Sequence, residues 1–258
     1  MKLNQSLGLG LSFNSPMNAA RAQFLNGEQG FLWDLRNRAT VFQDTIGNTP
    51  VTQYTDPVGM VKDQSGRNNH AIQSTAGSRP LYQLDGVPVL DFDGTDDFLS
   101  VAPFATGTNQ AQIYMRLRKD SDAATQAVLE SSASSSANNG ALAVFAPLTA
   151  ASPTYVARSR GMVTADAVSP ASYAAPSTVV LTALLDISGD SVTLRINGVA
   201  GTPTTTDQGA ATYGTHTHYI GRRAGTSLPF NGAISALMVR YGPTPTAAQI
   251  TAIEALMA

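Results

Sequence analysis

The chain has 258 residues, with 16 Lys and Arg against 18 Asp and Glu, a formal net charge of −2 and no cysteine. Only 13% of its residues are charged. It therefore lacks the basic surface that neutralises nucleic-acid phosphates, and we expect no nucleic-acid partner. The absence of cysteine excludes disulfide bonds and thiolate chemistry. No apolar run approaches the roughly 18 residues that span a bilayer, so we expect no membrane insertion.

Residues 1–28 are expected to form an extended N-terminal arm. Four apolar side chains of this segment alternate with Gly and Ser: Leu7, Leu9, Leu11 and Phe13. A period of two is typical of a strand, whereas a signal peptide has a continuous apolar segment, so we expect no signal peptide. The four side chains are expected to bind a partner, by adding a strand to an exposed sheet edge or by threading between subunits.

Residues 29–258 are expected to form one all-β domain. From Phe31 onward, short β-rich segments are separated by Gly, Asn, Asp, Pro and Ser, which is typical of antiparallel sheets. Strands are expected at residues 87–92, 98–101, 112–118, 141–148, 154–158, 178–185, 191–196, 218–221 and 233–241. Asn197 and Gly198 follow the cleanly alternating strand at 191–196 and form a typical hairpin turn, because both tolerate positive φ.

The strand at 112–118 is expected to bury one face and expose the other. The side chains predicted to face the core are Ile113, Met115 and Leu117, and those predicted to face outward are Gln112, Tyr114, Arg116 and Arg118.

Only the last segment has a helical period. Thr246 and Gln249 have capping-box spacing, and four apolar residues fall on one helical face: Ile250, Ile253, Leu256 and Met257. This short C-terminal helix is expected to cover the edge or the end of a sheet.

Four aspartates lie within seven residues between apolar flanks: Asp91, Asp93, Asp96 and Asp97. The favoured interpretation is a turn between two strands. In such a turn Gly94 supplies a positive φ and the carboxylates accept hydrogen bonds from loop amides. Phe92, Phe98 and Leu99 are then expected to enter the core.

Two other interpretations assign chemistry to the same aspartates. A helix-loop-helix calcium loop counted from Asp91 requires Gly at position six and Glu at position twelve, but the chain has Asp96 and Ala102 there. A glycosidase pair could be formed by Asp91 and Asp93, yet the three glutamates of the chain are isolated from each other: Glu28, Glu130 and Glu254. We therefore expect no catalytic residue and no complete metal site. A calcium ion held by one or two of these carboxylates stays open.

The histidines and aromatic residues give weaker signals. His216 and His218 would share one face of a strand, about 7 Å apart, but no third metal ligand is near them in sequence. His70 is expected in a loop. Trp33 lies in an apolar strand and is expected in the core. A glycan site could draw on the following aromatic residues, although their order in the chain selects none: Trp33, Tyr54, Tyr82, Tyr114, Tyr155, Tyr173, Tyr213, Tyr219 and Tyr241.

Many short motifs occur in a characteristic order along residues 30–258. In the first half these are Leu32–Asp34, Val41–Asp44, Asn48–Val51, Asp56–Gly59, Lys62–Gly66, Asn68–Ala71, Arg79–Pro80 and Leu90–Gly94. In the second half they are Leu194–Gly198, Tyr219–Arg222, Pro229–Gly232 and the capped helix. This series resembles the laminin-G-type, concanavalin A-like domains of tailed-phage virion proteins.

The resemblance implies a two-sheet antiparallel jelly roll in which Leu90–Gly94 and Asp97 are a fold signature, found also in members without enzymatic activity. It implies a non-enzymatic virion structural protein, part of the capsid surface, a fibre or the tail, whose partners are other virion proteins and copies of itself. The alternative is an adhesin that binds host-surface glycans, and a glycoside hydrolase is the least favoured. Some laminin-G relatives bind calcium, but no complete ligand set matches here.

Overall fold

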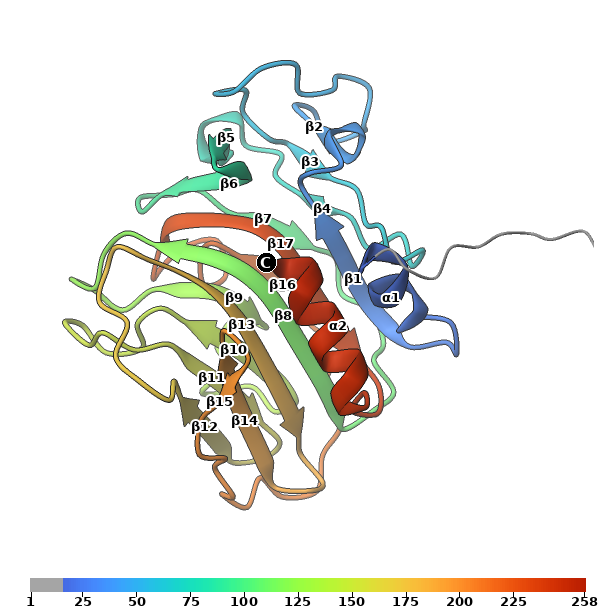
Figure 1. Ribbon diagram of the computed structural model, residues 1–258, viewed down its shortest axis with the longest axis vertical. Coiled ribbons are helices and arrows are strands. Elements are labelled where there is room, and N and C mark those ends of the chain that lie inside the picture. The colour runs from blue at the N-terminus through green and yellow to red at the C-terminus, as the bar shows by residue number, and fades with distance from the viewer. Residues whose placement is uncertain (1–15) are drawn as a thin grey trace, which may run out of the picture.

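The computed structural model describes residues 16–258, which form two antiparallel sheets packed face to face (Figure 1). Sheet A has the order β15 (Val199–Ala200), β14 (Ser191–Ile196), β13 (Ser177–Asp186), β8 (Gln110–Lys119), β17 (Asn231–Tyr241), β6 (Val87–Asp93) and β5 (Leu81–Asp85), and β1 (Gln29–Asp34) also pairs with β17. Sheet B has the order β12 (Thr164–Val168), β11 (Val156–Arg160), β10 (Ala141–Phe145), β9 (Ala127–Ser131), β16 (His218–Ile220), β7 (Leu99–Val101), β4 (Ala71–Ile72), β3 (Met60–Val61) and β2 (Val41–Phe42). The prediction of an all-β jelly-roll sandwich is confirmed.

Four helical segments complete the described chain: α1 (Pro16–Ala22), the short 3-10 helices η1 (Arg38–Thr40) and η2 (Ala76–Ser78), and α2 (Ala247–Met257). Neither α-helix within residues 16–258 is long and apolar enough to cross a membrane.

The core lies between the sheets and follows from alternation along the strands. In β14 every second residue is buried, namely Val192, Leu194 and Ile196. The hairpin turn after it is confirmed, because Asn197 and Gly198 have φ of 51° and 79°.

The outer face of sheet A, which points away from sheet B, is partly covered by α2. Thr246 caps this helix in the predicted capping box. The helix packs on β8, β13 and β17 and beside α1 (Figure 1). The expectation that it covers a sheet edge or end is therefore wrong, because its apolar side chains bury a sheet face. For the same reason Tyr114, expected to face outward, is fully buried beneath the helices. Gln112, also expected to face outward, is fully buried, because its side chain accepts from Arg240 and donates to the Gly242 carbonyl. Arg116 and Arg118, farther along β8, are partly exposed.

Residues 16–28 belong to the domain and not to an extended arm. Ala20 and Phe24 are buried in one cluster with the apolar face of α2. Arg240, which is 4% exposed, donates to the Gln23 carbonyl at 2.7 Å and to the Glu28 carboxylate at 3.0 Å. The rest of the predicted arm, with its partner-binding residues Leu7, Leu9, Leu11 and Phe13, lies outside the described residues and stays a prediction.

Candidate functional site

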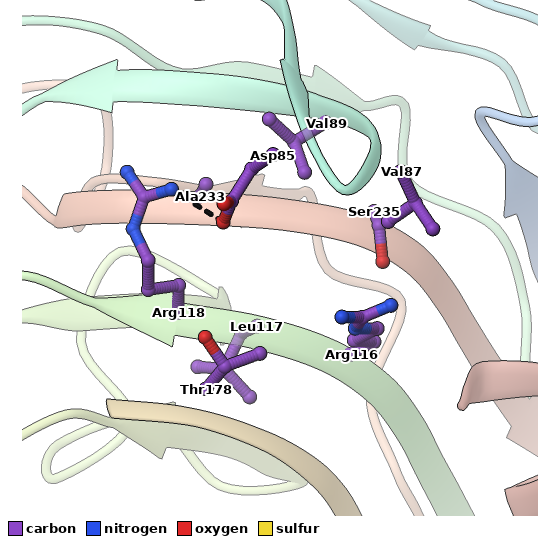
Figure 2. Close-up of a pocket in the computed structure, with 9 residues that line it drawn as sticks. All are labelled: Asp85, Val87, Val89, Arg116, Leu117, Arg118, Thr178, Ala233 and Ser235. Atoms are coloured by element: carbon purple, nitrogen blue, oxygen red, sulfur yellow. Dashed lines mark hydrogen bonds and ion pairs between the residues drawn. The ribbon is translucent and has the colours of Figure 1, made fainter. Parts of the chain in front are cut away.

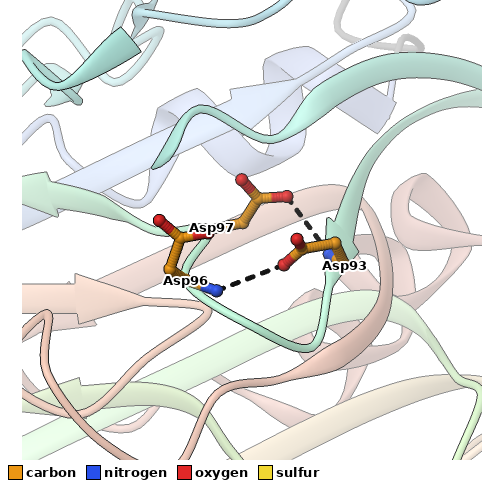
Figure 3. Close-up of side chains that lie close together, drawn as sticks. All are labelled: Asp93, Asp96 and Asp97. Atoms are coloured by element: carbon orange, nitrogen blue, oxygen red, sulfur yellow. Dashed lines mark hydrogen bonds between the residues drawn. The ribbon is translucent and has the colours of Figure 1, made fainter. Parts of the chain in front are cut away.

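The aspartate-rich segment is a turn that joins β6 of sheet A to β7 of sheet B (Figure 3). Asp93 Oδ1 accepts the amides of Thr95 at 2.8 Å and Asp96 at 3.3 Å. Asp97 Oδ2 accepts the amide of Asp93 at 3.1 Å. Gly94 has a φ of 75°. The carboxylates thus satisfy the amides of a chain segment that crosses between the sheets, and the predicted turn is confirmed.

The apolar side chains on either side of this turn differ in how deeply they are buried. Phe92 is buried as predicted, and its ring packs so closely on Gly221 that a Cβ there would lie 2.4 Å from it. Leu99 is also buried, but Phe98 is only partly buried and packs against Gly225. Gly221 and Gly225 both lie in the loop after β16, so this loop packs against the turn through Phe92 and Phe98.

Three carboxylates of the turn lie close together. One oxygen each of Asp93, Asp96 and Asp97 falls within 4.8 Å of the others. Asp96 Oδ2 also accepts the Ser78 hydroxyl at 2.7 Å. Burial raises the pKa of Asp97 to about 6, and the nearby charges of Asp93 and Asp96 act in the same direction. Within residues 16–258 none of the three forms an ion pair with Lys or Arg. Carboxylate oxygens are the ligands that Ca²⁺ prefers, so these three could contribute to a cation site. The hydrogen bonds from the turn amides already occupy part of the acceptor capacity of the Asp93 and Asp97 carboxylates.

Asp91 lies one pleat away, on the outer face of sheet A, and is engaged by an arginine. Arg118 contacts Asp85 at 2.6 Å, Asp120 at 2.7 Å and Asp91 at 3.3 Å. Burial raises the pKa of Asp91 above its usual value, although the charge of Arg118 acts in the opposite direction. The Asp85–Arg118 pair lies between the β5–β6 hairpin and β8 (Figure 2), in a space of about 10 Å³. That is room for about one water molecule and not for a sugar, and neither Asp91 nor Asp93 is among the residues that line it.

The histidines predicted to share a strand face are not brought together as a site. His216 precedes β16, and its Nε2 lies 3.0 Å from the Asn139 carbonyl oxygen. His218 is fully buried, with Nε2 2.6 Å from the Tyr241 hydroxyl. Its ring stacks on Phe104 at 5.0 Å. Burial lowers the pKa of His218 to about 3. His70 is in a loop as predicted, where its Nδ1 accepts the Asp63 amide at 3.1 Å.

Most of the aromatic residues that could have stacked on a sugar are core residues. Trp33 is 1% exposed, as predicted, and the other buried members are Tyr82, Tyr114, Tyr155, Tyr213 and Tyr241. Tyr54 is 46% exposed and stacks on Tyr82. Tyr173 and Tyr219 are partly buried. The described chain therefore offers scattered aromatic rings and no aromatic platform.

Comparisons with known proteins define the class of fold. No family model matches the chain, and no curated protein matches it in sequence. Among solved structures, an α-L-arabinofuranosidase soaked with a cyclic sulfate inhibitor aligns with a TM-score of 0.56 at 14% identity, over 79% of this chain and 51% of that one. The binding domain of botulinum neurotoxin serotype D aligns with a TM-score of 0.55 at 11% identity, over 86% and 51%. That of serotype G aligns with a TM-score of 0.55 at 10% identity, over 76% and 48%.

The chain thus spans about half the length of these structures. At such identities the likeness shows the fold alone, a lectin-like jelly-roll sandwich.

Proposed function

We propose that the chain is a non-enzymatic display module of a tailed-phage particle, anchored by residues 1–15 to another virion subunit or to its own copies. The ordered sequence motifs and the lectin-like fold support this role. The observation that carries it is the position of α1. Residues 1–15 join the domain at α1, which packs beside α2 on the outer face of sheet A. Sheet B forms the opposite face of the sandwich, so an anchor on the sheet A side presents sheet B outward.

The absence of an enzymatic role is part of the same proposal. Asp93 and Asp97 hold turn amides, and Asp91 is engaged by Arg118. Glycoside hydrolysis needs two carboxyl groups on either side of the scissile bond. One of the similar structures is an arabinofuranosidase, so a hydrolase remains the rival. It requires that Asp91→Asn or Asp93→Asn abolish a measurable turnover while the protein stays folded.

A pair of deletions tests the anchor. Removal of residues 1–15 should leave a folded domain, with an unchanged circular dichroism spectrum and unfolding midpoint, that no longer assembles into particles. Removal of residues 1–28 should also lower the unfolding midpoint, because it strips Phe24 and Glu28 from the domain. Normal assembly of the protein that lacks residues 1–15 would refute the anchoring role.

Glycan binding at a host surface is the second candidate. The likeness to the neurotoxin binding domains is of fold only. A specific observation on this chain nevertheless favours glycan binding, namely a hollow at the rim of the sandwich whose lining includes two carboxylates.

A further inference from the structure

An open hollow of about 560 Å³ lies where three loops meet at the rim of the sandwich. Asn109 comes from the β7–β8 loop, Ser188 and Asp190 come from the β13–β14 turn, and Asp207 and residues 209–212 come from the long connection between β15 and β16. The volume falls within the range of about 300–1,000 Å³ that is typical of small-molecule sites. The hollow is separate from the aspartate-rich turn, with which it shares no lining residue.

Two carboxylates of the lining are each held by one backbone amide. Asp190 Oδ1 accepts the amide of Gln208 at 2.8 Å, and Asp207 Oδ1 accepts the amide of Gly209 at 2.8 Å. The second oxygen of each carboxylate has no protein donor within residues 16–258. Each carboxylate is thus fixed in orientation and keeps an acceptor for a ligand.

The segment that carries Asp207 is held firmly by the core beneath it. Gln208 is fully buried, and its carbonyl accepts the amides of Met162 at 2.6 Å and Val163 at 3.2 Å. Its side-chain amide donates to the Asp186 carbonyl at 3.2 Å. A Cβ at Gly161 would lie 2.4 Å from the Gln208 carbonyl oxygen, so the β11–β12 hairpin lies directly against the loop. A site fixed in this way loses little entropy when a ligand binds.

The rest of the lining limits the chemistry of the ligand. It contains no Lys, Arg or His, so nothing in it compensates an anionic group, whereas the two carboxylates repel one. Gly209, Ala210 and Ala211 are small and leave room for close approach, and the methyl groups of the two alanines are the accessible apolar part of the lining, because Ile187 is 1% exposed. Hydroxyl groups can donate to carboxylate oxygens, and the C–H face of a sugar ring can pack on alanine methyl groups.

We propose that this hollow binds a neutral, hydroxyl-rich ligand, namely a pyranose unit of a host-surface glycan. The proposal rests on the role of the chain as a displayed module, which gives the rim access to a surface. Binding of a glycan at one hollow is weak, and several copies of the chain on one particle raise the overall binding strength by multivalency.

The test uses the full chain, biotinylated and assembled on streptavidin, on an array of neutral gluco-, galacto- and manno-oligosaccharides. The same array carries uronic-acid and amino-sugar oligosaccharides. Ala210→Trp fills the hollow from an exposed position without removing either carboxylate, and Asp207→Ala removes one acceptor. Ala150→Trp places the same side chain at an exposed alanine outside the lining and is the matched control.

The expected result is a signal on neutral glycans that falls about tenfold or more in Ala210→Trp and Asp207→Ala and is kept in Ala150→Trp. The proposal is overturned if no neutral glycan binds, if only charged glycans bind, or if binding survives in Ala210→Trp. Assembly into particles is measured on the same variants. Ala210→Trp should assemble normally, so loss of the glycan site and failure of the display role give different results.

Discussion

His218 provides the sharpest test of the core, because a fully buried imidazole lies between the two sheets. Its Nε2 is 2.6 Å from the Tyr241 hydroxyl, its Nδ1 has no hydrogen-bond partner among residues 16–258, and its ring stacks on Phe104. His218→Phe keeps a ring of similar size in the same contacts and removes the titrating group. The substitution also leaves the Tyr241 hydroxyl without this partner, a cost of about 1 kcal/mol that does not depend on pH.

The pH dependence follows from the lowered pKa of His218. Burial lowers it from 6.5 to about 3, so between these values the unfolded chain binds a proton that the folded chain does not. The stability of the wild-type protein therefore falls as pH falls through this window and is fully present above about pH 6.5. Between pH 8 and pH 5 the loss attributable to His218 is about 2 kcal/mol, and it approaches about 4 kcal/mol near pH 3.

Urea unfolding of the wild type and of His218→Phe at several pH values between 5 and 8 measures the pH-dependent contribution of His218 to stability. The free energy of unfolding of the wild type relative to that of His218→Phe should fall by about 2 kcal/mol from pH 8 to pH 5. Groups common to both proteins, including Asp97, cancel in the difference. Ile220→Val, a buried substitution in the same strand, should shift the midpoint by an amount independent of pH. A difference between wild type and His218→Phe that stays constant across this range would refute the reasoning, because it would mean that the folded protein admits a proton at His218.

Three further predictions concern the turn, α1 and the loop after β16. Asp97→Asn should raise the urea midpoint at pH 7.5. The raised pKa of Asp97, about 6, gives stability that is present below about pH 3.8 and lost as pH rises through 6, so the gain should vanish in acid. Arg240→Met should lower the free energy of unfolding by about 3 kcal/mol, because it leaves the Glu28 carboxylate unpaired, and limited proteolysis should then cut first within residues 16–28. Gly221→Ala should cost about 2 kcal/mol more than Gly66→Ala. The two glycines have φ of 90° and 89°, but only Gly221 has an aromatic ring where the Cβ would lie. Equal midpoints for these two variants would contradict the crowding at Gly221.

Strands could be predicted where only one of their faces is buried. The alternation of β14 gave its bounds without error, because its outward residues stay partly exposed. β9 was missed because all of its residues are buried and no alternation remains. Its Glu130, which should face outward, is covered by the Ser135 amide at 2.6 Å and by Arg223 at 2.7 Å. Such covering depends on loops from distant parts of the chain and leaves no periodic signal.

The same distinction separates the sites that sequence could and could not locate. The aspartate-rich turn is local, so Gly94 and its neighbours identify it directly. The rim hollow joins Asn109, Asp190 and Asp207 from three separate loops. The nearest signal in sequence is that Asp190 follows Gly189 and Asp207 lies two residues before Gly209, a pattern that many structural turns share. The expectation that His216 and His218 share one strand face failed because the strand begins only at His218 and points that ring into the core.

The attachment of α1 explains how an arm could hold the sandwich without loosening it. Arg240 of β17 binds the Gln23 carbonyl and Glu28, which ties the segment after α1 to the strand that pairs with β8, β6 and β1 in sheet A. Arg21 of α1 donates to the Gln64 carbonyl at 3.1 Å, and the loop that carries Gln64 joins β3 to β4 in sheet B. A pull on residues 1–15 is therefore shared between both sheets through buried and partly buried hydrogen bonds. Because rupture then requires several of these bonds to break together, the domain should resist detachment better than one held by α1 packing alone.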